Sequence, residues 1–176
     1  MRTLLTTTCI LLCLITFAQT KKGINEYEKG QKAYQSENFS EAFKWYDLSA
    51  QKGNCDAMFE LGSLYYDGLG VPQDDTKAYD WYKRAAEMGQ TYAMLTIGYW
   101  YANGIYVDLD YKETEKWYLK AANLENVKAM RYLGNLYYHG EEGINKDQDK
   151  AKMWFTKAAE YGDREANSIL IDLGWD

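Results

Sequence analysis

The sequence has little of the chemistry on which small enzymes and metal proteins depend. It contains one histidine, three cysteines and one proline in 176 residues, and two of the cysteines lie within the first 18 residues. One histidine with one remaining cysteine supplies no usual zinc ligand set. If those first 18 residues are removed, Cys55 is the only thiol, an intramolecular disulfide is excluded, and the folded state has to be stabilised by packing.

The sequence also lacks an excess of positive charge and a long hydrophobic run. Its 26 acidic and 20 basic residues give a formal charge of −6, which offers no broad cationic field for nucleic acid or anionic lipid. The apolar run from Leu4 to Phe17 is too short for a membrane-spanning helix of about 20 residues. No G-x-S-x-G, G-x-x-x-x-G-K or G-x-G-x-x-G motif occurs, so the glycines do not indicate a nucleophile elbow or a phosphate loop.

The N-terminal segment predicts a secretory signal peptide. One early basic residue precedes the apolar run, and Thr16 and Ala18 occupy the −3 and −1 positions for a cut before Gln19. We therefore expect residues 1–18 to be removed, which changes the formal charge to −7. A lipoprotein signal would need small residues before Cys13, where two leucines stand, and an uncleaved anchor is the remaining alternative. After cleavage the protein would be periplasmic or secreted.

What the sequence does have is an internal repeat of 36 residues. An aromatic pair recurs at intervals of 36, 36 and 37 residues, as Trp45-Tyr46, Trp81-Tyr82, Trp117-Tyr118 and Trp154-Phe155. Alanines keep the same phase at positions 57, 93, 129 and 166, and so do Leu61-Gly62, Ile97-Gly98 and Leu133-Gly134. Several registers in one phase are typical of a repeat architecture. The extra residue of the last interval falls within 140–143.

Each repeat predicts two amphipathic helices. Ala78, Trp81, Tyr82, Ala85 and Ala86 share one helical face, so the aromatic pair is expected to be buried packing and not a binding site. No segment has the pattern of a strand. The expected helices are 24–36, 39–52, 55–67, 75–88, 91–103, 111–123, 127–139, 148–161 and 164–173.

Residues with turn and cap preferences separate these helices. Glycines 53, 89 and 162 are expected to end the second helix of their units, and glycines 68, 104 and 140 the first, in the left-handed conformation. Asp74 and Asp147 are expected N-caps, and Asn38 with Glu41 forms a capping box. The single proline, Pro72, lies in a connecting loop.

The repeat resembles a known family. The unit A-x-x-W-Y-x-x-A-A-x-x-G-x-x-x-A-x-x-x-L-G-x-x-Y-x-x-G is similar to the Sel-one-like repeat, a relative of the tetratricopeptide repeat. The resemblance covers roughly residues 38–170, and the first unit is more similar to a plain tetratricopeptide repeat. Glu125 replaces a terminal glycine, and Leu170-Ile171 lacks the Leu-Gly pair, as suits a C-terminal capping helix.

The resemblance implies an all-α fold, an α/α superhelix of about four helix pairs and a C-terminal capping helix. Residues 19–176 would then form one solenoid domain. Its expected units are 24–53, 54–89, 90–125 and 126–162, with the cap at 163–176.

The family's usual role implies a scaffold or adaptor that binds a protein or peptide in its concave groove, without a cofactor. Tyrosines and amides suit peptide recognition, and Lys128 with Arg131 suits a carboxylate or acidic side chain. The groove positions carried over from the family are Tyr27, Gln31, Tyr34, Asp56, Phe59, Ser63, Tyr66, Tyr92, Leu95, Tyr99, Asn103, Lys128, Arg131, Asn135 and Tyr138.

Candidate catalytic and metal-binding residues have simpler interpretations. His139 is expected to lie near a helix C-terminus, and Cys55 lacks a neighbouring base. The segment from Asn145 to Asp149 resembles the start of a calcium loop but lacks the required glycine and glutamate. We therefore expect no catalytic set and no metal site.

Two further functions stay open. Some secreted bacterial members of the family are described as penicillin-binding or β-lactamase-like, which makes a hydrolase the alternative function. Those members have a cysteine pair in every repeat, and this chain has none. Self-association through the open ends of the solenoid is a further possibility.

Overall fold

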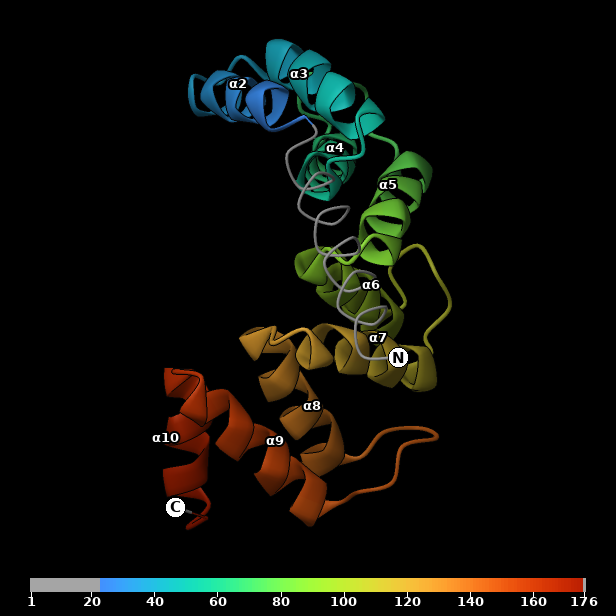
Figure 1. Ribbon diagram of the computed structural model, residues 1–176. Coiled ribbons are helices and arrows are strands. Elements are labelled where there is room, and N and C mark those ends of the chain that lie inside the picture. Colours follow the sequence, from blue (N-terminus) through green and yellow to red (C-terminus); the bar gives the residue numbers. More distant parts are fainter. Residues whose placement is uncertain (1–22, 176) are drawn as a thin grey trace, which may run out of the picture. The chain divides into compact units, whose positions relative to one another are not determined.

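A computed structural model describes residues 23–175, and these residues form nine α-helices (Figure 1). The helices begin at the predicted residues and end within one residue of the predicted ends. The predicted signal peptide lies outside the described residues. The helices are α2 (Ile24–Gln35), α3 (Phe39–Gln51), α4 (Cys55–Asp67), α5 (Asp75–Glu87), α6 (Thr91–Asn103), α7 (Tyr111–Asn123), α8 (Val127–His139), α9 (Gln148–Glu160) and α10 (Arg164–Asp172).

The described helices belong to two compact units, which meet in the sequence between Met88 and Gly89. Unit 1 contains α2 to α5, and unit 2 contains α6 to α10. Within each unit a helix packs mainly on its sequence neighbours, as in the pairs α2 with α3, α4 with α5, α6 with α7 and α8 with α9 (Figure 1). Each unit is therefore a stack of helical hairpins.

Side chains of the preceding residue cap the helices. The first helix of three repeats and the final helix α10 begin at an Asn, Gln or Asp whose side-chain oxygen accepts the amide N–H of a fully buried alanine three residues on. These cap pairs are Asn54 with Ala57, Gln90 with Ala93, Asn126 with Ala129, and Asp163 with Ala166. Such caps satisfy amide groups that the helix leaves unpaired.

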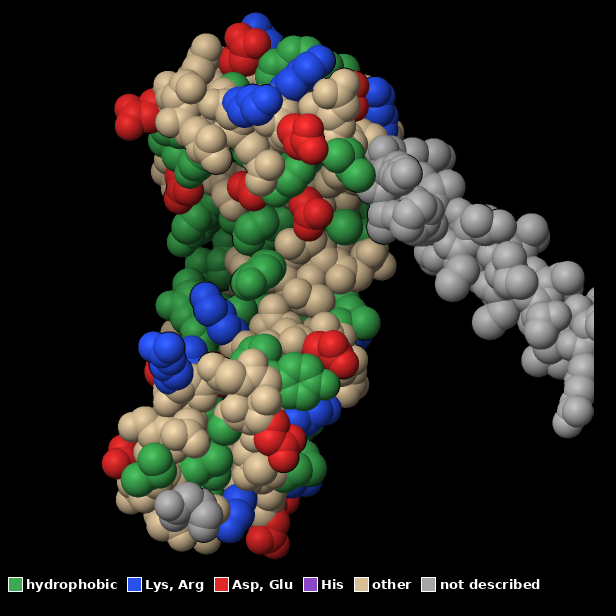
Figure 2. Space-filling view, turned by 60° about the vertical axis from the view of Figure 1, so that its left-hand side comes forward, with side chains coloured by type: hydrophobic (Ala, Val, Ile, Leu, Met, Phe, Trp, Pro, Cys, Tyr) green, Lys and Arg blue, Asp and Glu red, His purple; other side chains and the backbone are tan. Residues whose placement is uncertain are grey.

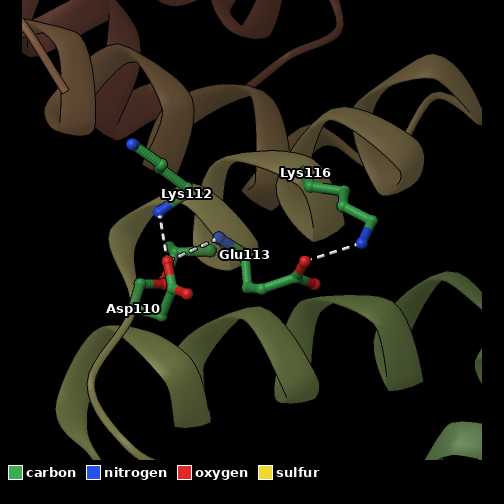
Figure 3. Close-up of polar contacts among 5 residues, drawn as sticks. Asp110, Lys112, Glu113 and Lys116 are labelled. Carbon is green, nitrogen blue, oxygen red and sulfur yellow. Dashed lines mark hydrogen bonds and ion pairs between the residues drawn. The ribbon is translucent and has the colours of Figure 1, made fainter. Parts of the chain in front are cut away.

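The second helices of the repeats from α5 onward begin at aspartates. The Asp74 and Asp147 caps are confirmed, since their carboxylates accept the amide N–H groups of Lys77 and Lys150. At the start of α7, Asp110 accepts two amide N–H groups, and Glu113 forms a 2.7 Å ion pair with Lys116 (Figure 3).

Residues with positive φ end the helices at a regular spacing. Gly53, Gly89 and Gly162 have φ values of 87°, 97° and 91°, as predicted, and Glu125 occupies the corresponding place with φ 62°. Gly140 differs from the prediction. Its φ of 66° is combined with ψ of 146°, outside the left-handed helical region, and the longer loop that follows pairs Glu141 with Ile144.

The core repeats one contact between a helical glycine and an aromatic ring. A β-carbon built on Gly62 would lie 2.7 Å from the ring of Tyr82, and one on Gly98 would lie 2.5 Å from that of Tyr118. Gly30 with Tyr46 and Gly134 with Phe155 make the same contact. The second member of each aromatic pair is thus the one that fills the space between paired helices.

The expectation that Trp81 is a buried spacer therefore needs correction. Tyr82 is only 4% exposed, whereas Trp81 is half-buried, and the Arg84 guanidinium lies 4.5 Å from its ring centroid. Lys120 and Lys157 stack in the same way on Trp117 and Trp154. Trp117 and Trp154 are each only 7% exposed, so the expected burial is confirmed for these two, whereas Trp81 lies at the edge of the core.

Candidate functional site

The strongest candidate site is an open cleft of about 410 Å³ within unit 2, which we call the tyrosine cleft. It is built by α6, α7 and α8 and by the loop after α8. The lining residues are Tyr99, Ala102, Asn103, Tyr111, Thr114, Tyr118, Tyr132, Asn135, Leu136, His139 and Glu141. Three residues of the predicted groove, Tyr99, Asn103 and Asn135, are thereby brought together.

Tyr118 places a hydroxyl at the cleft that no described residue satisfies. Its side chain is 5% exposed, with the ring against Gly98 and 5.6 Å from that of Tyr132. The hydroxyl forms no hydrogen bond with any residue in 23–175. Burial, with Tyr132 and Tyr99 nearby, raises the pKa of Tyr118, so the phenol is neutral at physiological pH. Because no buried side-chain nitrogen or oxygen among the described residues lacks a partner, the Tyr118 hydroxyl is the part of this side chain that solvent reaches.

The residues at the register of Tyr118 in the other repeats differ in the contacts of the hydroxyl or lack it. In unit 1 the Tyr82 hydroxyl lies 3.2 Å from Ser63 Oγ, to which it donates a hydrogen bond. Tyr99 stands 36 residues after Ser63 and therefore replaces that partner in the next repeat. In the last repeat Phe155 has no hydroxyl. Tyr118 and, in the first repeat, Tyr46 are thus the members of the series whose hydroxyls form no hydrogen bond with a described residue, and Tyr118 is the one that lines the cleft.

The rim of the cleft carries amides and one carboxylate. Asn103 donates its side-chain N–H to the Tyr99 carbonyl at 2.8 Å, which leaves its amide oxygen as an acceptor. Partial burial and the neighbouring Glu141 carboxylate, to which the Tyr111 hydroxyl donates, raise the pKa of Tyr111. Glu141 is the one carboxylate among the described lining residues, and neither lysine nor arginine lines the cleft.

The two basic residues predicted to line the groove, Arg131 and Lys128, lie in different environments. The Arg131 guanidinium forms ion pairs with Asp163 at 3.0 Å and Glu165 at 2.7 Å, and the Arg131 side chain is 13% exposed. Its charge is therefore already matched by two carboxylates. Lys128 is exposed on α8. Tyr138 packs edge-on against Trp175, with ring centroids 5.8 Å apart.

In unit 1 several predicted groove residues are engaged in packing. Tyr34 packs edge-on against Phe39, and the Phe59 ring lies 5.4 Å from that of Tyr82. The exposed groove residues there are Gln31, Tyr34, Asp56 and Tyr66. In unit 2 Tyr92 is exposed as well, whereas Leu95 is half-buried.

Tyr27 and Glu60 form the main polar contact of this surface. The Tyr27 hydroxyl donates to Glu60 Oε1 at 3.5 Å. Burial and the Glu60 charge raise the pKa of Tyr27 to about 12. Burial also raises the pKa of Glu60.

The sequence alone does not predict several polar residues of these surfaces. It indicates packing for Tyr118 and a helix end for His139, and it does not single out Glu60. The sequence does contain an indication that Tyr118 differs from Tyr82. Ser63, the partner of Tyr82, is replaced by Tyr99 in the next repeat, and Tyr118 is replaced by Phe155 one repeat later.

On the face seen in Figure 2, hydrophobic side chains reach the surface, and acidic and basic side chains are interspersed. Within residues 23–175, no group of three or more His, Cys, Asp or Glu side chains is arranged to hold a metal ion. In the same part of the chain, no helix combines the length and hydropathy needed to cross a membrane. Burial raises the pKa of the Cys55 thiol.

Comparison with known protein families identifies the repeat. The family model described as Sel1 repeat matches residues 17–54, 55–90, 91–126 and 127–163. The chain belongs to the Sel1 repeat family. The first repeat, which is more similar to a plain tetratricopeptide repeat by eye, also matches this model. Sel1 repeat proteins are generally non-enzymatic scaffolds that mediate protein interactions.

Solved Sel1 repeat structures share the fold. A Sel1 repeat protein from Oxalobacter formigenes is 30% identical with a TM-score of 0.76, and the match covers 89% of this chain and 66% of that one. The protective antigen c5321 of uropathogenic Escherichia coli, which displays an SLR fold, is 29% identical with a TM-score of 0.76. That match covers 89% of this chain and 35% of the antigen.

A curated relative matches over a shorter stretch. A sel1-like repeat-containing protein of Acanthamoeba polyphaga mimivirus is 47% identical over 58 residues, which are 32% of this chain and 10% of the viral protein. The chain thus spans only part of the relatives that it matches.

Proposed function

We propose that the protein is an exported, non-enzymatic scaffold that binds an extended segment of a partner protein in the tyrosine cleft. The observation that carries the proposal is the Tyr118 hydroxyl, which lies at the cleft, has no hydrogen-bond partner among the described residues and is reached by solvent. A partner atom that enters the cleft would satisfy it. Because Sel1 repeat proteins are generally protein-interaction modules, the proposed partner is a protein.

The lining of the cleft suits a peptide. Tyrosine provides a large contact area and a polar handle at low entropy cost, and it is enriched among the residues that dominate binding energy. The side-chain amides of Asn103 and Asn135 lie on neighbouring helices of the same repeat series and can pair with backbone N–H and C=O groups. The cleft volume lies within the usual range of about 300–1,000 Å³ for binding pockets.

The hydrolase alternative finds no supporting arrangement in the described residues. Thr114 is the only serine or threonine that lines the cleft, and its Oγ1 donates to the Asp110 carbonyl at 3.0 Å. A nucleophile needs an adjacent base, and Thr114 is instead held by the backbone. Turnover of a chromogenic β-lactam by the purified protein would revive this alternative.

Site-specific photo-cross-linking in the source organism tests the proposed site. A benzoylphenylalanine at Tyr99, which is 47% exposed at the cleft, is expected to cross-link a specific protein. The matched control places the same probe at Met153, which is 52% exposed on α9 and does not line the cleft. Identical cross-linked products from both positions would contradict the assignment of the site.

Export is tested separately by the N-terminus of the protein purified from its source. Cleavage by a signal peptidase would leave a chain that begins at Gln19 and contains Cys55 as its only thiol. Intact-mass measurement and thiol titration check both statements. A mature protein that retains Met1, or one with lipid on Cys13, would contradict this part of the proposal.

A further inference from the structure

We propose that the tyrosine cleft accepts a basic side chain, lysine or arginine, of the partner segment. This inference rests on the proposed function and names the chemistry of the partner. It differs from the expectation drawn from Lys128 and Arg131, which favoured an acidic partner.

The charges around the cleft favour a cation. Glu141 lies at the rim, and its negative charge is not opposed by any lysine or arginine among the described lining residues. Arg131, the nearby candidate for holding a carboxylate, is occupied by Asp163 and Glu165. An incoming acidic side chain would therefore meet a carboxylate, whereas a basic side chain would meet an opposite charge.

The aromatic walls favour the same occupant. Tyr99, Tyr111, Tyr118 and Tyr132 all line the cleft, and the Arg131 guanidinium carbon already lies 5.1 Å from the ring centroid of Tyr132, so the other three rings are the ones left for a ligand. A cation is attracted to the face of an aromatic ring, and the attraction is larger where water is excluded. The chain already uses this contact internally, since Lys120 lies 4.0 Å from the ring centroid of Trp117.

The Tyr118 hydroxyl completes the site. Lysine and arginine side chains carry only hydrogen-bond donors, so they need acceptors around them. The neutral Tyr118 phenol offers an acceptor oxygen at the cleft that no described residue uses. A basic side chain would thus be held by an aromatic wall, the Tyr118 hydroxyl and the Glu141 carboxylate.

The test is a titration of the isotope-labelled protein followed by amide NMR signals. The probes are acetyl-Gly-Gly-X-Gly-Gly-amide peptides in which X is lysine, arginine, norleucine or glutamate, together with the glycan chitotriose. The lysine and arginine peptides are expected to shift the amide signals of residues lining the cleft. Norleucine has the length of lysine without its charge, and it is expected to bind at least fivefold more weakly.

Two variants separate the contribution of the rim charge from that of the Tyr118 hydroxyl. Glu141→Gln removes the rim charge, and Glu142→Gln removes an adjacent exposed charge that does not line the cleft. Tyr118→Phe removes only the hydroxyl, and the chain itself carries Phe155 at this register. Glu141→Gln and Tyr118→Phe are each expected to weaken lysine-peptide binding about fivefold. Glu142→Gln should bind as the unaltered protein does, and Tyr118→Phe should keep its melting temperature.

The outcomes distinguish this inference from the proposed function. Equal binding of the lysine and norleucine peptides, or tighter binding of the glutamate peptide, would overturn the basic-side-chain assignment while peptide binding stands. Shifts at the cleft with chitotriose alone would overturn both. If no probe shifts the cleft signals, the basic-side-chain inference is wrong, and the cross-linking experiment still decides whether the cleft binds a protein.

Discussion

The ring of Tyr82 lies directly against the backbone of Gly62. A β-carbon at Gly62 would be 2.7 Å from the Tyr82 ring, closer than real contacts allow, and the contact recurs in three other helix pairs. Glycine in the middle of a helix is unfavourable by about 1 kcal/mol relative to alanine. The protein thus accepts a weaker helix in order to bring two helices close together.

Gly62→Ala is expected to destabilise the protein although alanine favours the helix. The overlap with Tyr82 should cost about 1–3 kcal/mol and outweigh the propensity gain. The measurement is the urea dependence of unfolding. Asp80→Ala, at an exposed position of α5, is the control and should change the free energy of unfolding by less than about 0.5 kcal/mol. A more stable Gly62→Ala protein would show that the ring does not lie on the backbone.

Tyr82→Ala is expected to cost more than Trp81→Ala. Tyr82 is 4% exposed, and loss of a buried aromatic side chain costs about 3–5 kcal/mol. Trp81 is half-buried beneath Arg84, and we expect its loss to cost about 1–2 kcal/mol. The two free energies of unfolding, measured by urea denaturation, check this order, and an equal or larger loss for Trp81→Ala would contradict it.

Glu125→Gly is expected to stabilise the protein by about 1 kcal/mol. Glu125 has φ 62°, a conformation that costs a residue with a β-carbon about 1 kcal/mol relative to glycine. The variant also loses the exposed hydrogen bond from the Tyr161 hydroxyl, a smaller contribution. Glu125→Ala loses the same bond but keeps the unfavourable backbone, so its melting temperature should fall below that of Glu125→Gly.

Glu60→Gln is expected to raise the melting temperature at pH 7 and to raise it less at pH 4. Burial holds the pKa of Glu60 above its ordinary value of 4.5, so the folded state binds its proton more tightly than the unfolded chain. Stability is therefore lost as the pH rises above that ordinary value and Glu60 ionises. Glutamine avoids this loss and still offers an oxygen to Tyr27. The exposed Glu28→Gln is the control, and an equal effect of Glu60→Gln at both pH values would contradict the assignment.

The local features of this fold could be predicted well from the sequence. Helix starts depend on a side chain three residues away, as with Asp74 and Lys77, and helix ends depend on one glycine. Such signals lie within a few residues, and the repeat presents them several times over. Gly140 departs from the pattern because the extra residue in its loop changes the path of the chain.

Features that depend on distant neighbours could not be predicted in the same way. Arg131 and Asp163 are 32 residues apart, and each looks like a separate surface feature in the sequence. Tyr99, Asn103 and Asn135 were predicted as groove residues, but the cleft that they share with Tyr118 depends on three packed helices. The free hydroxyl of Tyr118 could not be predicted from the Trp-Tyr motif, because the tyrosine of the same motif in the previous repeat, Tyr82, donates its hydroxyl to Ser63.

The hairpin-by-hairpin packing within each unit has a consequence for synthesis of the chain. Because a helix makes most of its contacts with its sequence neighbours, no helix of unit 1 has to wait for the last part of the chain before it finds its partner. Chains dominated by such local contacts fold quickly, and repeat arrays can begin to fold at more than one place. Unit 1 can therefore form before unit 2 is complete.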